Sequence, residues 1–399
     1  MARVLVCGFY GRGNAGDEAI LQCIYETLRP AHEVGIALHL TDTHPGFREW
    51  YPYDDCTLLD DSTVGPMLEW GADALLIGGG GLSPGHGAHL ALTMRMLGRP
   101  TLLAGTDNLD FCLESAGTPI PLARFDCFAT QFRDCLANPD PSAFAAYMAD
   151  FRYLGLRFTA GLERTCALGA APALGADWAF ALPTTPAQPP VEGPACAIVL
   201  RAWDERFHDH EFRFQVHRLF HGVRRAGLVP FLLPFSPEDE ALALRLAPLL
   251  DAPLARHWWN PRAIKGVLAN CALAVSVGRL HPLVFAAPLS IPTCHLSAPI
   301  ADAARGRPLK CALLCQELGL PDFDGVDAFE AALAAGGIPP ADPARLQDVM
   351  ARYGAMASGV LAAIKGSRPA IGLDPAAAHI PAAGVAAADA AMPSGEAAA

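Results

Sequence analysis

Residues 271–296, CALAVSVGRLHPLVFAAPLSIPTCHL, are the stretch around which the rest of the chain is arranged. The apolar run 273–277 has the length of a buried strand, and it breaks at Gly278. Pro282 then opens an apolar helix, because proline is tolerated in the first helical turn, and a second short strand is expected over 289–293. This order of strand, turn and helix predicts a parallel α/β unit.

Two ionisable side chains, Arg279 and His281, stand between that strand and that helix. They are therefore expected at the carboxyl end of a parallel strand, which is where open α/β sheets bind ligands. The helix N-terminus beside them adds backbone N–H groups and a partial positive charge, which favour an anion. The alternative interpretation is that Arg279 pairs with a surface carboxylate and that His281 is only a polar residue at a helix start.

A glycine-rich segment near the amino end, GFYGRGNAGDE, follows a buried strand and precedes a helix over 19–28. Its glycines let the backbone turn sharply and approach a ligand, but their spacing is not the GxGxxG of dinucleotide sites. We interpret the segment as a substrate-facing loop, with a tight turn closed by a helix cap as the alternative. Its candidate site residues are Gly13, Asn14, Gly16, Asp17 and Glu18.

Two further segments of the first half supply candidates. Four consecutive glycines, including Gly79 and Gly80, follow the buried strand 74–77 and would suit a ligand or a neighbouring backbone that passes very close. Asp177 stands beside an aromatic ring in the segment GADW. It is either a substrate-binding residue that faces a cleft or a turn aspartate that binds its own backbone.

Both halves of the chain alternate strand and helix, which predicts an α/β protein with two doubly wound, Rossmann-like domains facing a cleft. The proline-rich segment 183–194 marks the boundary, so the domains are predicted to span 1–182 and 195–340. A helix over 341–364 could pack back on the first domain. Residues 365–399 are rich in alanine and proline and are predicted to form a flexible tail.

The composition of the 399 residues narrows the possible partners. The net charge of −12 argues against nucleic acid, and it means that local cations must hold any anionic substrate. No signal-peptide pattern and no run of about 18–20 apolar residues is present, so a cytoplasmic location is predicted, with peripheral membrane attachment and self-association left open. The 12 cysteines form no CxxC pair, which predicts reduced thiols and no metal site.

Several of these motifs together resemble the polysaccharide pyruvyl transferase family over about residues 3–320. The motifs are GFYGRGNAGDEAIL, the GGGG run, GADWAF, Arg201 with Trp203, and VGRLHPLVFA. The resemblance implies a glycosyltransferase-B-like (GT-B-like) fold. It also implies transfer of a pyruvyl group from phosphoenolpyruvate to a sugar hydroxyl of a cell-surface glycan or its lipid-linked precursor, without a cofactor.

The resemblance also implies roles for individual residues. Arg201 and Arg279 would bind the donor anion, and His281 would be the catalytic acid or base. Leu280, between Arg279 and His281, is a further substrate-binding candidate. Two guanidinium groups suit a donor that carries a carboxylate and a phosphate, and an imidazole titrates near neutrality, as proton transfer requires. Asp17 is the second catalytic candidate, since Asp17, Glu18 or Asp177 could orient or deprotonate the acceptor hydroxyl.

Three segments differ from the family pattern: Gly105-Thr106-Asp107-Asn108, Arg157-Phe158 in place of an Arg-Asp pair, and Cys294-His295-Leu296-Ser297. These differences leave the acceptor and the donor open. Two other functions therefore stay under consideration. One is a nucleotide-sugar glycosyltransferase of the same architecture, and the other is a non-catalytic binding or scaffold protein.

Overall fold

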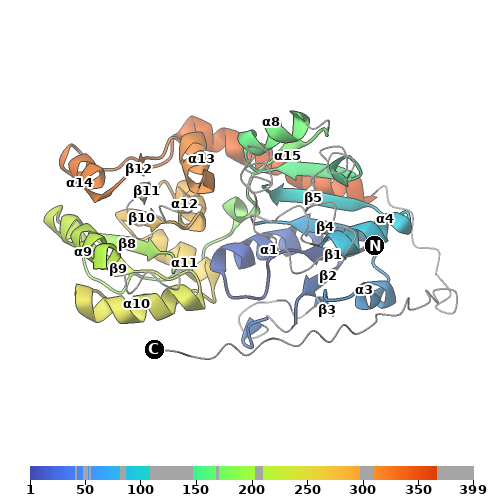
Figure 1. Ribbon diagram of the computed structural model, residues 1–399, viewed down its shortest axis with the longest axis horizontal. Helices are drawn as coiled ribbons and strands as arrows, with labels where there is room; N and C mark the ends of the chain where they lie inside the picture. Colours follow the sequence, from blue (N-terminus) through green and yellow to red (C-terminus); the bar gives the residue numbers. More distant parts are fainter. Residues whose placement is uncertain are drawn as a thin grey trace, which may run out of the picture. The chain divides into compact units, whose positions relative to one another are not determined.

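The computed structural model describes residues 1–40, 43–47, 53, 55–80, 87–107, 147–167, 170–202, 210–296 and 309–365. Within them, two parallel sheets are surrounded by helices (Figure 1). Residues Met1–Ser367, which include both sheets, form one compact unit. Of the predicted tail, only Lys365 is among the described residues. Asn108, Trp203 and Ser297 also lie outside them.

The first sheet has seven parallel strands in the order β3-β2-β1-β4-β5-β6-β7. The strands are β1 (Arg3–Cys7), β2 (Glu33–Leu38), β3 (Thr57–Asp60), β4 (Ala74–Gly78), β5 (Thr101–Thr106), β6 (Tyr153–Leu156) and β7 (Ala173–Leu174). The helices are α1 (Ala15–Leu28), α3 (Gly65–Trp70), α4 (Ala88–Met96), α8 (Thr159–Ala167) and the 3-10 helix η2 (Trp178–Ala181).

The second sheet has five parallel strands in the order β12-β11-β10-β8-β9. The strands are β8 (Ala195–Leu200), β9 (Val229–Leu232), β10 (Leu273–Val277), β11 (Thr293–Leu296) and β12 (Asp322–Phe323). The helices are α9 (His210–Arg225), α10 (Pro237–Leu250), α11 (Pro261–Leu268), α12 (His281–Ala286), η4 (Ala287–Leu289), α13 (Leu309–Leu318), α14 (Val326–Ala334) and α15 (Pro343–Lys365).

Both sheets are doubly wound, as predicted. The chain leaves β1 toward β2 and returns to β4 on the other side of β1, and it repeats this course from β8 to β9 and back to β10. The loops that follow β1, β4, β8 and β10 therefore lie at the two switch points, where ligands bind in folds of this class. Each of these loops carries residues that the sequence singled out. The glycine-rich loop follows β1, the glycines Gly79 and Gly80 follow β4, Arg201 follows β8, and the turn with Arg279 and His281 follows β10.

Two predicted strands are wrong. The strand expected over 289–293 begins only at Thr293, because Pro292 has no N–H to donate to the sheet, and residues Ala287–Leu289 form a 3-10 turn instead. The alternation of strand and helix in the second half also predicts a strand over 253–258, but this segment forms only one isolated bridge, between Leu232 and Leu254.

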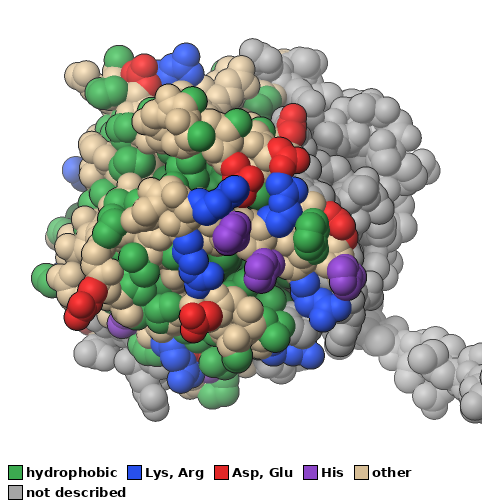
Figure 2. Space-filling view, turned by 90° about the vertical axis from the view of Figure 1, so that its left-hand side faces the viewer, with side chains coloured by type: hydrophobic (Ala, Val, Ile, Leu, Met, Phe, Trp, Pro, Cys, Tyr) green, Lys and Arg blue, Asp and Glu red, His purple; other side chains and the backbone are tan. Residues whose placement is uncertain are grey.

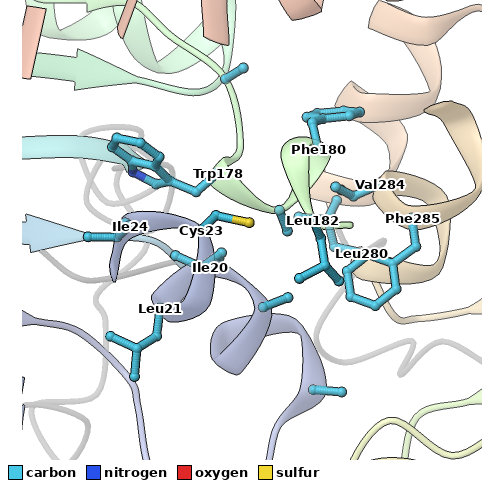
Figure 3. Close-up of a cluster of buried hydrophobic side chains, with 14 of the residues drawn as sticks. Ile20, Leu21, Cys23, Ile24, Trp178, Phe180, Leu182, Leu280, Val284 and Phe285 are labelled. Atoms are coloured by element: carbon cyan, nitrogen blue, oxygen red, sulfur yellow. The ribbon is translucent and has the colours of Figure 1, made fainter. Parts of the chain in front are cut away.

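The two halves share one hydrophobic core (Figure 3). Helix α1 packs beside η2 and α11, and α12 also contacts η2. The shared cluster includes Ile20, Leu21, Cys23, Ile24, Trp178, Phe180, Leu182, Leu280, Val284 and Phe285. This packing fixes the amino end of α1 against the start of α12, so the two switch points meet.

Two other segments join the halves. The proline-rich segment 183–194 lies on α11, where Thr185 N–H donates to Arg262 O (3.1 Å) and Asn270 donates to Ala187 O (3.0 Å). Helix α15 returns to the first sheet and contacts β5, β6 and η2. Among the described residues, no helix is both long enough and apolar enough to cross a membrane.

Candidate functional site

The glycine-rich loop folds over the side chain of Glu18, which stands at its carboxyl end. Glu18 is fully buried, and its Oε1 accepts a hydrogen bond from Gly13 N–H (3.2 Å). Burial raises the pKa of Glu18 to about 8, although backbone N–H groups of Gly13, Gly11 and Arg12 act in the opposite direction. Because these N–H groups face an internal carboxyl group, this part of the loop folds around Glu18.

The raised pKa of Glu18 makes stability depend on pH. Between its ordinary value of 4.5 and about 8, the folded protein binds more protons than the unfolded chain, so stability falls as pH rises through this window. Glu18→Gln keeps the acceptor for Gly13 and removes this dependence. We expect the variant to be more stable than the wild type at pH 8, by roughly 4 kcal/mol, and to match it near pH 4.5.

Denaturant unfolding at several pH values measures this difference. Glu238→Gln is the matched control, since Glu238 also stands in the first turn of a helix but is exposed. A Glu18→Gln variant whose stability follows the wild-type pH profile would show that the carboxyl group ionises normally.

The amino end of α1 is capped by Asn14. Its side-chain oxygen accepts from Gly16 N–H (3.3 Å), and its amide donates to Asp17 Oδ2 (2.5 Å). Burial raises the pKa of Asp17, while His281 and Lys310 act against the rise. Asp17 is nearly buried at the point where the second half begins to pack, so it lies at the meeting point of the two halves.

The glycines after β4 let α1 approach the sheet. Gly79 has φ +75°, and a Cβ atom there would lie 2.1 Å from Ile20 Cγ2. Gly80 has φ +72°, and its carbonyl accepts from Thr106 Oγ1 (3.0 Å). Close approach of a neighbouring element, one of the two explanations that the sequence offered, therefore accounts for Gly79.

Arg279 is held by a buried carboxylate. Its Nε and Nη2 donate to the two oxygens of Asp239 (2.9 and 2.7 Å), and Nη2 also donates to Ser236 Oγ (2.9 Å). Asp239 additionally accepts from Ala202 N–H (2.8 Å). The guanidinium is thus locked in place beside the strand end from which Arg201 begins.

Replacing Asp239 tests this anchor. Asp239→Asn removes the charge that pairs with Arg279 and weakens the acceptor for Ala202, so we expect a loss of about 1–3 kcal/mol in unfolding free energy. Glu240→Gln is the control, because its partner Arg256 is more than half exposed and such pairs contribute about 0–1 kcal/mol. Equal losses in the two variants would contradict the anchoring role.

Arg201 and Leu280 are the other two predicted substrate-binding residues near Arg279. Arg201 N–H donates to Val277 O (3.1 Å), so Arg201 and Arg279 follow two strands that are hydrogen-bonded to each other. The Leu280 side chain is buried in the shared core. Only its backbone is therefore available to a ligand in this structure.

Asp177 belongs to a buried ion cluster that sequence reasoning missed. Arg157 donates through Nη1 to Asp177 Oδ2 (2.7 Å) and through Nε to Asp107 Oδ2 (2.9 Å), and a second, shorter bond joins Arg157 Nη2 to Asp107. All three side chains are at most 4% exposed. Although burial alone would raise it, contacts with His281 and Arg157 lower the pKa of Asp177 to about 2.

The side chain of His281, which belongs to the second half, contacts residues of the first half. Its Nε2 lies 3.7 Å from Asp177 Oδ2, and it has no hydrogen-bond partner among the described residues. The Nδ1 side of the ring packs directly on Gly16, where an added Cβ atom would lie 1.8 Å from His281 Nδ1. The contact of His281 with Gly16 thus brings two switch-point loops together, and Asp177, which follows β7 at the edge of the first sheet, lies beside them.

A hollow lies on the outer face of the second half, where Figure 2 shows histidine and basic side chains near one another. It is lined by His217, Arg218, His221, Arg225 and Glu330. Its two arginines already pair with Glu330, and Arg218 also pairs with Asp327. This hollow therefore offers little unpaired charge, and the switch-point site is the better candidate.

No group of three or more histidine, cysteine or acidic side chains that could hold a metal ion occurs in the described part of the chain. The signal for the ion cluster was present in the sequence, since Asp107 and Arg157 stand in two of the segments that differ from the family pattern. Their partnership could not be read from spacing, because they are 50 residues apart.

No family model and no curated protein matches this chain. Solved structures do match its fold. A UDP-glucose: anthocyanidin 3-O-glucosyltransferase in complex with UDP has a TM-score of 0.54 at 8% identity, covering 92% of this chain and 99% of its own. The calicheamicin glycosyltransferase CalG4 has a TM-score of 0.50 at 14% identity, covering 91% and 95%. The glycotransferase of kitacinnamycin has a TM-score of 0.50 at 12% identity, covering 91% and 97%. The chain therefore has the two-domain fold of GT-B glycosyltransferases.

Proposed function

We propose that this chain is a transferase that moves a group from a phosphate-bearing donor to a sugar hydroxyl. The observation that carries the proposal is that His281, from a switch-point loop of the second half, lies against Gly16 in the switch-point loop of the first half and faces Asp177. An imidazole at that position can exchange a proton with a reacting hydroxyl. Asp17 stands beside it as the second candidate for this proton transfer.

Phosphoenolpyruvate is the donor that the sequence motifs favour. This donor is supported by the proximity of the two motifs, since Gly16 and Asp17 of one half lie beside His281 of the other. Two nitrogens of Arg279 bind Asp239 and Ser236, while Nη1 has no hydrogen bond to the described residues. That nitrogen, together with Arg201, is where a carboxylate or phosphate of the donor would bind.

A nucleotide sugar is the donor that the structural comparisons favour. Two of the matched proteins are described as glycosyltransferases, and one of these was solved with UDP. The same switch points would then hold the diphosphate, and His281 would act on the acceptor hydroxyl. Both donors place a phosphate group beside Arg279, so the site geometry supports either one.

Donor binding separates the two. Isothermal titration with phosphoenolpyruvate, UDP-sugars and GDP-sugars should show one class binding to the wild type and failing to bind Arg279→Gln. Phosphate release together with an acid-labile pyruvyl ketal would establish pyruvyl transfer, and release of a nucleoside diphosphate would establish glycosyl transfer. Absence of binding by every donor would overturn both and favour a non-catalytic binding or scaffold protein.

A further inference from the structure

Asp177 is oriented by contacts on both of its oxygens. Oδ1 accepts from Ala179 N–H (2.9 Å), which caps η2, and Oδ2 accepts from Arg157 Nη1 (2.7 Å). The same Oδ2 faces His281 Nε2 at 3.7 Å. These bonds hold the carboxylate inside the first half, and acceptor capacity that remains on Oδ2 faces His281.

Arg157 is itself fixed on its far side. It follows β6, its backbone N–H donates to Thr106 O (2.9 Å), and its guanidinium binds Asp107 at the end of β5. The cluster holds two carboxylates and one guanidinium, so it keeps a net negative charge beside His281. A buried negative charge favours an N–H donor over a lone pair at the facing ring nitrogen.

We infer that Arg157 is a positioning residue that, with Asp107, holds the Asp177 carboxylate 3.7 Å from His281 Nε2 and so favours an N–H on that nitrogen. A neutral imidazole has one donor and one acceptor nitrogen, so this contact leaves Nδ1 as the nitrogen that can take a proton. Nδ1 lies over Gly16 in the first turn of α1. The inference rests on the proposed function only in giving His281 an acid or base role.

The tautomer of His281 can be measured without any substrate. Long-range ¹H–¹⁵N spectra of protein labelled at histidine, with His281 assigned by a His281→Gln variant and recorded where the ring is neutral, should show the Nε2–H form. Arg157→Gln should give a mixture of tautomers. Asp177→Asn should favour the Nδ1–H form, because an amide can present its own N–H to Nε2.

Arg95→Gln is the matched control for a lost arginine. Arg95 belongs to the same half, is mostly buried and pairs with Asp150 and Thr101. Its replacement should leave the His281 tautomer unchanged. Arg157→Lys, which keeps the charge but not the two-sided contact, should restore part of the Nε2–H signal and serves if Arg157→Gln does not fold.

Kinetics give a second, separable result. Arg157→Gln should lower kcat by about 10- to 100-fold through misplacement of the ring, with the KM for the donor changed by less than about threefold. A wild type with the Nδ1–H form, or a folded Arg157→Gln with an unchanged tautomer, would overturn the inference. If the wild type transfers no group but the tautomers behave as expected, the proposed function fails and the positioning role stands.

Discussion

Replacing His281 with asparagine is expected to lower kcat by about 10²- to 10⁴-fold, the usual contribution of a positioned acid or base. Donor affinity should change by less than about threefold, because Arg279 stands two residues away, Arg201 follows a different strand, and both charges remain. The measurement is the rate of phosphate or nucleotide release under saturating donor, together with donor titration of the same variant.

His281→Asn has two controls. His217→Asn removes an exposed histidine of α9 and should retain the wild-type rate. His281→Gln has a longer side chain and fills more of the space between Gly16 and Phe285, so agreement between the two His281 variants would exclude a packing defect as the cause. A His281 variant that keeps more than about a tenth of the wild-type kcat would remove the imidazole from the mechanism.

The sequence correctly located those candidate residues that directly follow the end of a buried strand. The alternation of strand and helix predicts two doubly wound sheets, and in such sheets the residues after β1, β4, β8 and β10 gather at switch points. Arg279, His281 and Arg201 were placed correctly at these ends because a buried apolar run followed by glycine marks the end of a strand.

Partners that are distant in sequence could not be predicted. Asp239 stands 40 residues from Arg279, and Asp107 stands 50 residues from Arg157, so no helical or strand periodicity relates them. The direction of the Glu18 side chain was also hidden. A first-turn glutamate usually faces solvent near the helix dipole, but here the loop folds back over it and buries it completely.

The glycines were the least predictable part. Glycine permits both a ligand and a neighbouring element to come close, and the sequence does not distinguish them. At Gly79 the neighbour is Ile20 of α1, and at Gly13 it is Trp258 of the second half, whose ring would lie 2.8 Å from an added Cβ atom. Glycine is therefore needed at these two positions because neighbouring elements pack against the backbone there.

Gly16→Ala is expected to separate the two halves at the site. An added Cβ atom would lie 1.8 Å from His281 Nδ1, and real atoms cannot approach so closely, so either the ring or α12 must move. Because the ring is fixed on one side by Asp177 and on the other by α1, we expect kcat to fall by at least about 100-fold and stability to fall by about 1–3 kcal/mol, as for overpacked cores.

Gly354→Ala is the matched control for Gly16→Ala, since Gly354 also lies in a helix and an added Cβ atom there meets no atom within 4 Å. Its replacement should raise stability by up to about 1 kcal/mol through helix propensity. Thermal unfolding and kcat measured for both variants separate the general effect of alanine from the contact with His281. A Gly16→Ala variant with unchanged kcat would mean that His281 does not need its position on α1 for catalysis, and that the junction of the two switch points is a packing contact alone.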